Sequence, residues 1–268
     1  MRAIFLFLLL SGFLRAEDPG LTGPGLEISL IAEIASITPG MPLTVGLHLD
    51  HFPGFHTYWR NPGMVGMETS LDWKLPPGFT ASEIRWPAPE NTFMNQYPCH
   101  GYERDVTLLV TITPPKAIAT KEVTLSAETG WMCCAKGCFP GFETFSLTLP
   151  VRDQPVTAPD HQALIAKAQK ELPATDHAIT ATLLSAVDAP IIKILFTSPR
   201  PLPRDDLYFF SNDRQISSEH AQKFQPQDEG SLLLTVPRSE FSPEKKTTIP
   251  GVLRVGQKSY ALTVTPKG

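Results

Sequence analysis

Three of the four cysteines, Cys133, Cys134 and Cys138, lie close together between Gly130 and Gly141. Two thiols at such a spacing form a disulfide that either exchanges with the thiols of another protein or stabilises the fold. The fourth cysteine, Cys99, lies well upstream. The Gly130 to Gly141 segment is therefore the first candidate for redox chemistry.

Two alternating runs flank this segment and predict the hairpin that positions its cysteines. Residues 122–128 and 143–149 both place apolar side chains at every second position, which is typical of strands. A three-residue loop, 135–137, with Gly137 in the left-handed conformation would set Cys134 opposite Cys138. Opposed Cβ atoms lie about 4.5–5.5 Å apart and a disulfide needs about 3.5–4.5 Å, so a small adjustment closes this bond.

Cys133 must point to the opposite face of the strand, because successive side chains alternate. We expect it to form a structural disulfide with Cys99. The alternatives for Cys99 are a free thiol, an intermolecular link or a resolving cysteine.

Side chains near the pair are expected to tune or shield it. Lys136 lies between the two cysteines and would lower a thiol pKa, while Trp131, Phe139 and Phe142 would cover the sulfurs or form a docking surface. The small loop closed by the bond contributes only about 2 kcal/mol of stability. A disulfide that contributes so little stability suits thiol exchange better than a structural role.

Composition restricts the compartment and the class of partner. Residues 1–16 contain Arg2, a short apolar run and Ala16 before an acidic pair, which resembles a secretory signal peptide. We therefore expect a mature protein that is exported to the periplasm and has no transmembrane segment, since no later apolar run is long enough. The net charge of −4 and the lack of a basic cluster argue against a nucleic-acid partner.

The first half reads as short strands separated by Pro and Gly. The expected strands are 26–36, 43–49, 70–75, 82–86, 106–113 and the two hairpin runs, with another strand near 55–60. This spacing predicts an all-β, immunoglobulin-like sandwich. Every Cys, Trp and Met lies at or before Pro150, so function is expected in this half.

The second half predicts a short linking helix and a smaller β-sandwich-like domain. Asp160 would cap a helix that continues to Leu172. The expected strands that follow are 178–184, 191–197, 207–210, 231–236, 252–255 and 260–265. The predicted organisation is a signal peptide at 1–16, a redox domain at 17–152, a linker with the helix at 153–175 and a second β domain at 176–268.

Several motifs in order resemble the N-terminal periplasmic region of the DsbD family of thiol:disulfide interchange proteins, in its ScsB-like branch. They are residues 55–63 (FHTYWRNPG), 71–73 (LDW), 75–79 (LPPGF), 86–89 (WPAP), 101–103 (GYE), Trp131-x-x-Cys134-x-x-x-Cys138-x-Pro140 and 147–150 (LTLP). The likeness is strong over residues 25–150. Cys99 and Cys133 are additional to the pattern.

The resemblance implies an immunoglobulin-like domain that needs no cofactor. Its cysteine pair, Cys134 and Cys138 by motif position, would accept electrons from a membrane-embedded thiol reductase. It would pass them to oxidised periplasmic proteins of the thioredoxin fold. Because no membrane domain follows in this sequence, the donor is expected to be a separate protein.

Two other functions are also compatible with the residue types in this sequence. Side chains with soft donor atoms that would suit Cu(I) favour a copper-binding or copper-tolerance protein, although no compact motif groups these residues. They are His56, Met64, Met67, Met94, Cys99, His100, Met132 and Cys133. A binding module stapled by disulfides is the other alternative. It predicts a disulfide potential below about −300 mV.

Overall fold

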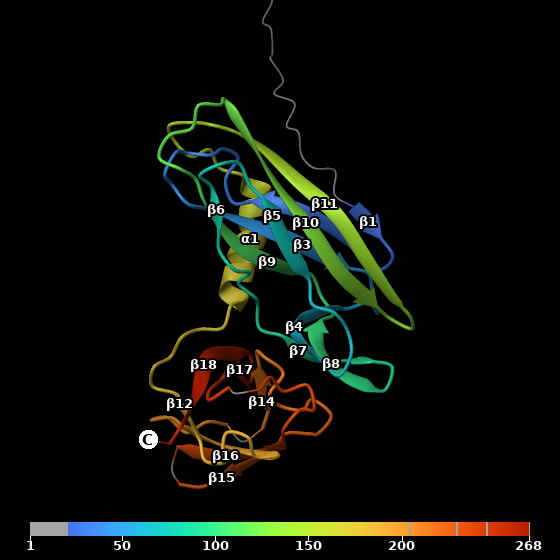
Figure 1. Cartoon of the computed structure of the whole chain (residues 1–268), viewed down its shortest axis with the longest axis vertical. Helices are drawn as coiled ribbons and strands as arrows, with labels where there is room; N and C mark the ends of the chain where they lie inside the picture. Colours follow the sequence, from blue (N-terminus) through green and yellow to red (C-terminus); the bar gives the residue numbers. More distant parts are fainter. Residues whose placement is uncertain (1–20, 204, 229, 245, 268) are drawn as a thin grey trace, which may run out of the picture.

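The computed structural model describes residues 21–203, 205–228, 230–244 and 246–267, so the expected signal peptide lies outside the described residues. Within them the fold is all-β and immunoglobulin-like in architecture, with one helix. Two β regions follow each other along the chain, and a small third sheet lies between them (Figure 1).

The first region is a sandwich of two sheets whose paired neighbours are all antiparallel. One sheet has the order β1 (Leu21–Gly23), β2 (Leu26–Ala32), β3 (Leu43–His51), β9 (Val106–Thr113) and β6 (Thr80–Ala81). The other has the order β11 (Cys138–Pro150), β10 (Glu122–Cys134) and β5 (Ser70–Lys74). Apolar side chains from both sheets, such as Leu47, Leu108, Leu125 and Phe145, form the main core between them.

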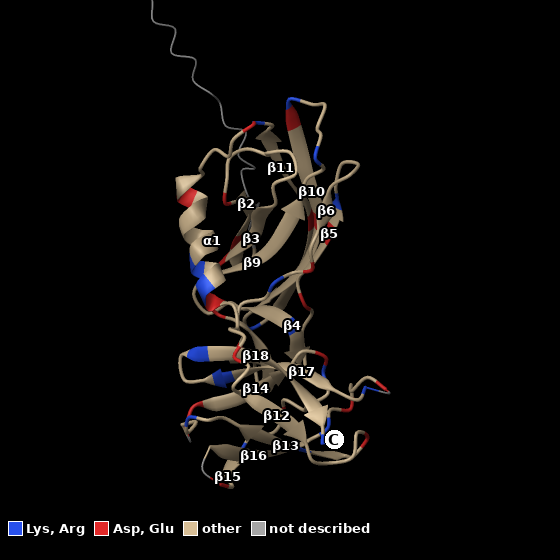
Figure 2. Cartoon of the chain, turned by 90° about the vertical axis from the view of Figure 1, so that its left-hand side faces the viewer, with Lys and Arg blue, Asp and Glu red and all other residues tan. Residues whose placement is uncertain are grey.

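The helix α1 (Pro159–Glu171) covers the outer face of the first sheet. Its buried residues, Ile165 and Ala168, pack against Ile31 of β2 and Leu109 of β9, and the helix runs beside β9 (Figure 2). This explains why six of the eight residues of β9 are buried, since its two faces meet the sandwich core and the helix respectively.

The start of α1 differs from the expected one. Asp160 lies in the first turn, where its charge suits the helix dipole, but the N-cap is Ala158 and no side chain caps the helix. Pro159 occupies the first helical position instead, where its missing N–H costs no hydrogen bond.

The third sheet has the order β4 (Thr57–Gly63), β8 (Tyr97–Tyr102) and β7 (Glu90–Met94). Strands β7 and β8 were not expected, because Pro98 and short polar stretches mask their alternation. The expected strand at 82–86 is wrong: Arg85 forms only an isolated bridge to Leu109, and the strand nearby is β6.

The second region is a seven-stranded sheet around its own core. Its order is β14 (Leu207–Ser211), β17 (Ile249–Val255), β18 (Lys258–Pro266), β12 (Thr180–Leu183), β13 (Ile191–Thr197), β16 (Ser231–Pro237) and β15 (Phe224–Pro226). We call it the second domain. Across the described residues no helix is both long and apolar enough to cross a bilayer.

Candidate redox site

The cysteine pair lies at the tip of the β10–β11 hairpin. Cys134 ends β10 and Cys138 begins β11, and the two are directly opposed in the register with Cα atoms 4.2 Å apart and a disulfide between them. This confirms the expected bond. The loop closes differently from the prediction, since Ala135 N–H donates to the Gly137 carbonyl at 2.9 Å and Gly137 does not adopt a positive φ.

The two sulfur-bearing residues differ in exposure. Cys134 is fully buried, at 0%, whereas Cys138 is exposed. A thiolate that attacks this bond must reach a sulfur from solvent. The Cys138 sulfur is therefore the one that an attacking thiolate can reach, and Cys134 would be the leaving group of such an attack.

The segment that enters β4 holds the hairpin tip in place. His56 and Cys134 exchange two backbone hydrogen bonds, each 2.9 Å long. The Tyr58 hydroxyl lies 4.0 Å from the Cys138 sulfur. Burial raises the pKa of Tyr58 above its usual range, so the phenol keeps its proton and can donate it in a hydrogen bond to a Cys138 thiolate.

His56 is a buried histidine beside the pair. Its ring meets Tyr58 edge-on at 5.1 Å between centroids, and Nε2 finds no hydrogen-bond partner within the described residues. Burial lowers the pKa of His56, so the ring is held neutral at physiological pH.

Cys99 and Cys133 are both free and buried, so the expected bond between them is not formed. Cys133 points into the main sandwich core, whereas Cys99 packs in a separate small cluster with Tyr58 and Cys134. Cys133 thus lies on one face of β10, and Cys99, a residue of β8, packs against the opposite face. Burial raises the pKa of Cys99 to about 11 and that of Cys133 to about 12, which keeps both protonated.

The residues that were expected to modulate the cysteine pair or to contact a partner fall into two groups. Trp131 is only 4% exposed and packs on Phe145 in the core, so it cannot form a docking surface. Phe139 and Phe142 are exposed at 41% and 74%, and Lys136 is exposed in the loop. Exposed aromatic side chains therefore lie on β11 close to Cys138, with Phe142 on the same face of the strand as Cys138 and Phe139 on the other face.

The structure gathers only some of the proposed soft ligands. Met94 and Met132 pack against the cluster that contains Cys99 and Cys134, while His100 turns toward the second domain. No group of three or more His, Cys, Asp or Glu side chains within the described residues is arranged to hold a metal ion.

Residues 31–150 match the family described as thiol:disulfide interchange protein DsbD, N-terminal. This segment belongs to the DsbD N-terminal family. The matched span contains the disulfide and the residues that cluster around Cys134, namely Tyr58, Val65, Met94, Cys99 and Met132.

Solved structures support the same fold for the DsbD N-terminal segment and the second domain together. The N-terminal periplasmic domain of ScsB from Proteus mirabilis superposes with a TM-score of 0.71 at 15% identity, covering 95% of this chain and 100% of that one. A conserved domain protein from Bacillus anthracis reaches a TM-score of only 0.28 at 10% identity, covering 90% of this chain and 77% of that one. That score is too low to indicate a shared fold. No curated protein matches the chain.

Sequence reasoning missed the residues that join the DsbD N-terminal domain to the second domain. Asn61 and His100 form this contact from β4 and β8. Both lie in or next to segments that carry the family likeness, but no local pattern reports a contact made across more than 100 residues. Tyr58 was missed as a site residue because it meets Cys138 across 80 positions of the chain.

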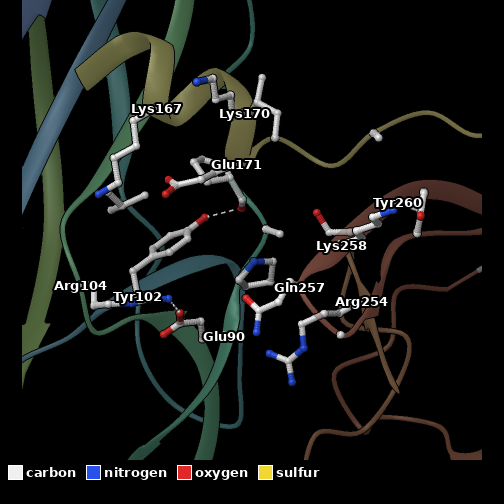
Figure 3. A pocket seen from close by; sticks show the side chains of 18 of the residues that line it. Glu90, Tyr102, Arg104, Lys167, Lys170, Glu171, Arg254, Gln257, Lys258 and Tyr260 are labelled. Atoms are coloured by element: carbon white, nitrogen blue, oxygen red, sulfur yellow. Dashed lines mark hydrogen bonds and ion pairs between the residues drawn. The ribbon is translucent and has the colours of Figure 1, made fainter. Parts of the chain in front are cut away.

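A cleft of about 850 Å³ lies between the DsbD N-terminal domain and the second domain (Figure 3). The last turn of α1 and the β17–β18 hairpin face each other across it. Most charges that line it are already paired: Arg104 with Glu90, Lys167 with Asp105 at 2.5 Å, and Arg254 with Asp206 at 3.8 Å. Lys170, Lys258 and Glu171 also line the cleft, so it carries charges of both signs.

Proposed function

We propose that the Cys134–Cys138 pair carries electrons from a membrane-embedded thiol reductase to oxidised periplasmic proteins of the thioredoxin fold. One observation carries the proposal: a disulfide at a hairpin tip joins a buried residue, Cys134, to an exposed one, Cys138. The family match supports thiol–disulfide interchange as the chemistry. The identity of the electron donor, the identity of the acceptor and the direction of electron flow are part of the proposal.

Reduction begins with attack of a donor thiolate on the Cys138 sulfur. The Cys134–Cys138 bond breaks, Cys134 leaves as a thiolate, and a mixed disulfide joins Cys138 to the donor. A second thiol of the donor then attacks the donor sulfur of this mixed disulfide, which forms a disulfide within the donor and releases Cys138 as a thiolate. Two electrons have then entered the pair, and each thiolate takes up a proton according to its pKa.

Transfer to the acceptor reverses these roles. The Cys138 thiolate attacks one sulfur of the acceptor disulfide, and the other acceptor sulfur leaves as a thiolate. Cys134 then attacks the Cys138 sulfur, which restores the internal bond and frees the acceptor as a dithiol. Tyr58 supports this cycle by donating a hydrogen bond to Cys138 when that sulfur is a thiolate.

The proposed compartment is the periplasm, after removal of residues 1–16. Thiol exchange of this kind belongs in a compartment where disulfides form and must also be reduced. The structurally similar domain of ScsB is a periplasmic one, and this supports the same location here.

Trapping of the mixed disulfide tests the proposal. The reduced Cys134→Ser variant, mixed with an oxidised thioredoxin-fold disulfide isomerase, should accumulate a covalent complex through Cys138, because the resolving thiol is missing. Cys138→Ser is the matched control and should give no complex, since its remaining thiols are buried. Equal complex formation by both variants, or by neither, would contradict the assigned roles.

Copper binding is a second candidate, favoured by the packing of Met94, Cys99 and Met132 around Cys134. Sulfur ligands of this kind suit Cu(I). Titration of the reduced protein with Cu(I) tests it. Stoichiometric binding that survives replacement of both Cys134 and Cys138 by Ser would favour a copper protein, and absence of binding to the reduced protein would exclude it.

A further inference from the structure

The β4–β8–β7 sheet has the redox site on one face and the second domain on the other. Tyr58 and Cys99 pack against Cys134, whereas their chain neighbours Trp59 and His100 meet Phe210 of the second domain, with ring centroids 6.0 and 5.0 Å apart. Adjacent residues in a strand point to opposite faces. The sheet thus links the second domain to the disulfide, and in Figure 1 it lies between the second domain and the tip of the β10–β11 hairpin.

A buried network of hydrogen bonds fixes the sheet to the second domain. Nδ1 of His100 lies 3.2 Å from the Asn61 carbonyl, and Nε2 lies 3.2 Å from the Tyr208 hydroxyl. Because a carbonyl only accepts, Nδ1 carries the proton and Nε2 accepts from Tyr208. The Asn61 amide in turn donates to the Ser211 carbonyl at 2.6 Å.

The same contact is closely packed around these hydrogen bonds. A Cβ atom at Gly63 would lie 2.7 Å from the Ser218 hydroxyl oxygen, and Gly63 is opposed to Cys99 in the β4–β8 register. Phe210 and Val252 of the second domain belong to the same buried cluster as the core of the first. Small movements of the second domain must therefore displace residues of β4 and β8, because close packing leaves no free space between them.

We infer that the second domain is a positioning element of the redox site. Through His100 and Asn61 it holds the β4–β8–β7 sheet against the hairpin tip, so that Tyr58, Cys99 and Met94 keep Cys134 covered and leave Cys138 as the sulfur that partners attack. The inference assigns a role to the second domain and rests on the proposed function. Asn61 and His100 act through the sheet and do not touch the sulfurs.

The test measures which cysteine of the reduced protein reacts first. The full chain is reduced with excess dithiothreitol, freed of the reductant, and alkylated with iodoacetamide in a time course. Mass spectrometry then gives the alkylation rate at each of the four cysteines. The wild type should show a strong preference for Cys138 over Cys134.

Loosening the contact should reduce that preference. Tyr208→Phe removes only the hydroxyl that His100 accepts from, and Asn61→Ala removes the bond to Ser211. Tyr208→Phe should lower the ratio of the Cys138 rate to the Cys134 rate about fivefold, the range set by loss of one buried hydrogen bond. Asn61→Ala also loses the bond from the Gly63 N–H and should lower the ratio at least as much. Tyr260→Phe is the matched control, since it removes a hydroxyl from the wall of the interdomain cleft, and it should leave the ratio unchanged.

Two results would overturn the inference. One is an unchanged ratio in both Tyr208→Phe and Asn61→Ala. The other is faster alkylation that extends equally to Cys99 and Cys133, which would indicate general loosening of the fold. Reduction by dithiothreitol makes the test independent of whether the pair exchanges with proteins. Failure of the proposed function and failure of this inference are therefore distinguishable.

Discussion

The two sulfurs of the redox pair have different surroundings although they share one bond. Cys134 is enclosed by Tyr58 and Cys99, while Cys138 starts an exposed stretch of β11. Their order of reaction follows from this difference, because an incoming thiolate meets Cys138 first. Burial thus decides which sulfur is attacked by controlling access, whereas a positively charged neighbour acts by lowering the pKa of a thiol.

Cys99 and Cys133 should count as unreactive free thiols. Burial raises their pKa to about 11 and about 12, and the thiolate fraction falls about tenfold for each pH unit below the pKa. At pH 8 the native, oxidised protein should therefore gain no alkyl group from iodoacetamide over a time that labels an ordinary thiol. In guanidinium chloride it should gain two, one at each free cysteine.

The pH dependence of this labelling has a definite sign. Native-state labelling of Cys99 should rise about tenfold per unit between pH 7 and 9, as the thiolate fraction grows. If the denatured protein gains no alkyl group at all, Cys99 and Cys133 form a disulfide, and the description of the two thiols is wrong.

At the scale of elements, the β10–β11 hairpin carries the exposed aromatic surface as well as the disulfide. Phe142 is 74% exposed and lies four positions from Cys138 on the same strand. Exposed aromatic side chains of this kind often dominate a binding interface. The hairpin is therefore expected to provide both the reactive sulfur and part of the partner contact.

Phe142→Ser should slow exchange with a thioredoxin-fold protein about tenfold, since truncation of an anchoring aromatic costs about 1–2 kcal/mol or more. Exchange with glutathione should stay unchanged, because a small thiol needs no docking surface. Phe241→Ser, which removes a 48% exposed aromatic from the second domain, is the control. Equal slowing with glutathione would show that Phe142 acts on the sulfur chemistry instead.

The hairpin was also the element best predicted from sequence. Alternation in 122–128 and 143–149 set its register, and the three-residue loop then paired Cys134 with Cys138. The left-handed conformation expected for Gly137 was wrong. Trp131 lies in the core instead of on a docking surface, because a local pattern does not say whether an aromatic at a hairpin tip faces the core. Strands β7 and β8 escaped prediction because Pro98 and polar residues interrupt their pattern.

At the scale of the whole molecule, the second domain and the redox domain share a buried contact built around a neutral histidine. His100 is 3% exposed, and burial lowers its pKa to about 4. A protonated ring could not accept from Tyr208, and it would also repel Arg254. This contact was beyond sequence reasoning, since Asn61 and Ser211 are 150 positions apart.

Acid should weaken this contact. Because the pKa of His100 is depressed in the folded state, its contribution to stability is present above pH 6.5 and is lost as the pH falls toward 4. By pH 5 the loss amounts to about 2 kcal/mol. Urea unfolding of the wild type should show this loss between pH 7 and 5, and the His100→Gln variant, which cannot titrate there, should show a shallower dependence. Identical pH profiles would contradict the role given to His100.

The reduction potential of the Cys134–Cys138 bond tests the central claim most directly. It is read from the reduced fraction of the pair after equilibration in glutathione buffers and thiol trapping, with mass spectrometry to separate this pair from Cys99 and Cys133. An electron carrier predicts a midpoint between about −180 and −270 mV, where thioredoxin-fold proteins exchange. A midpoint below about −300 mV would make the bond a structural staple and contradict the account.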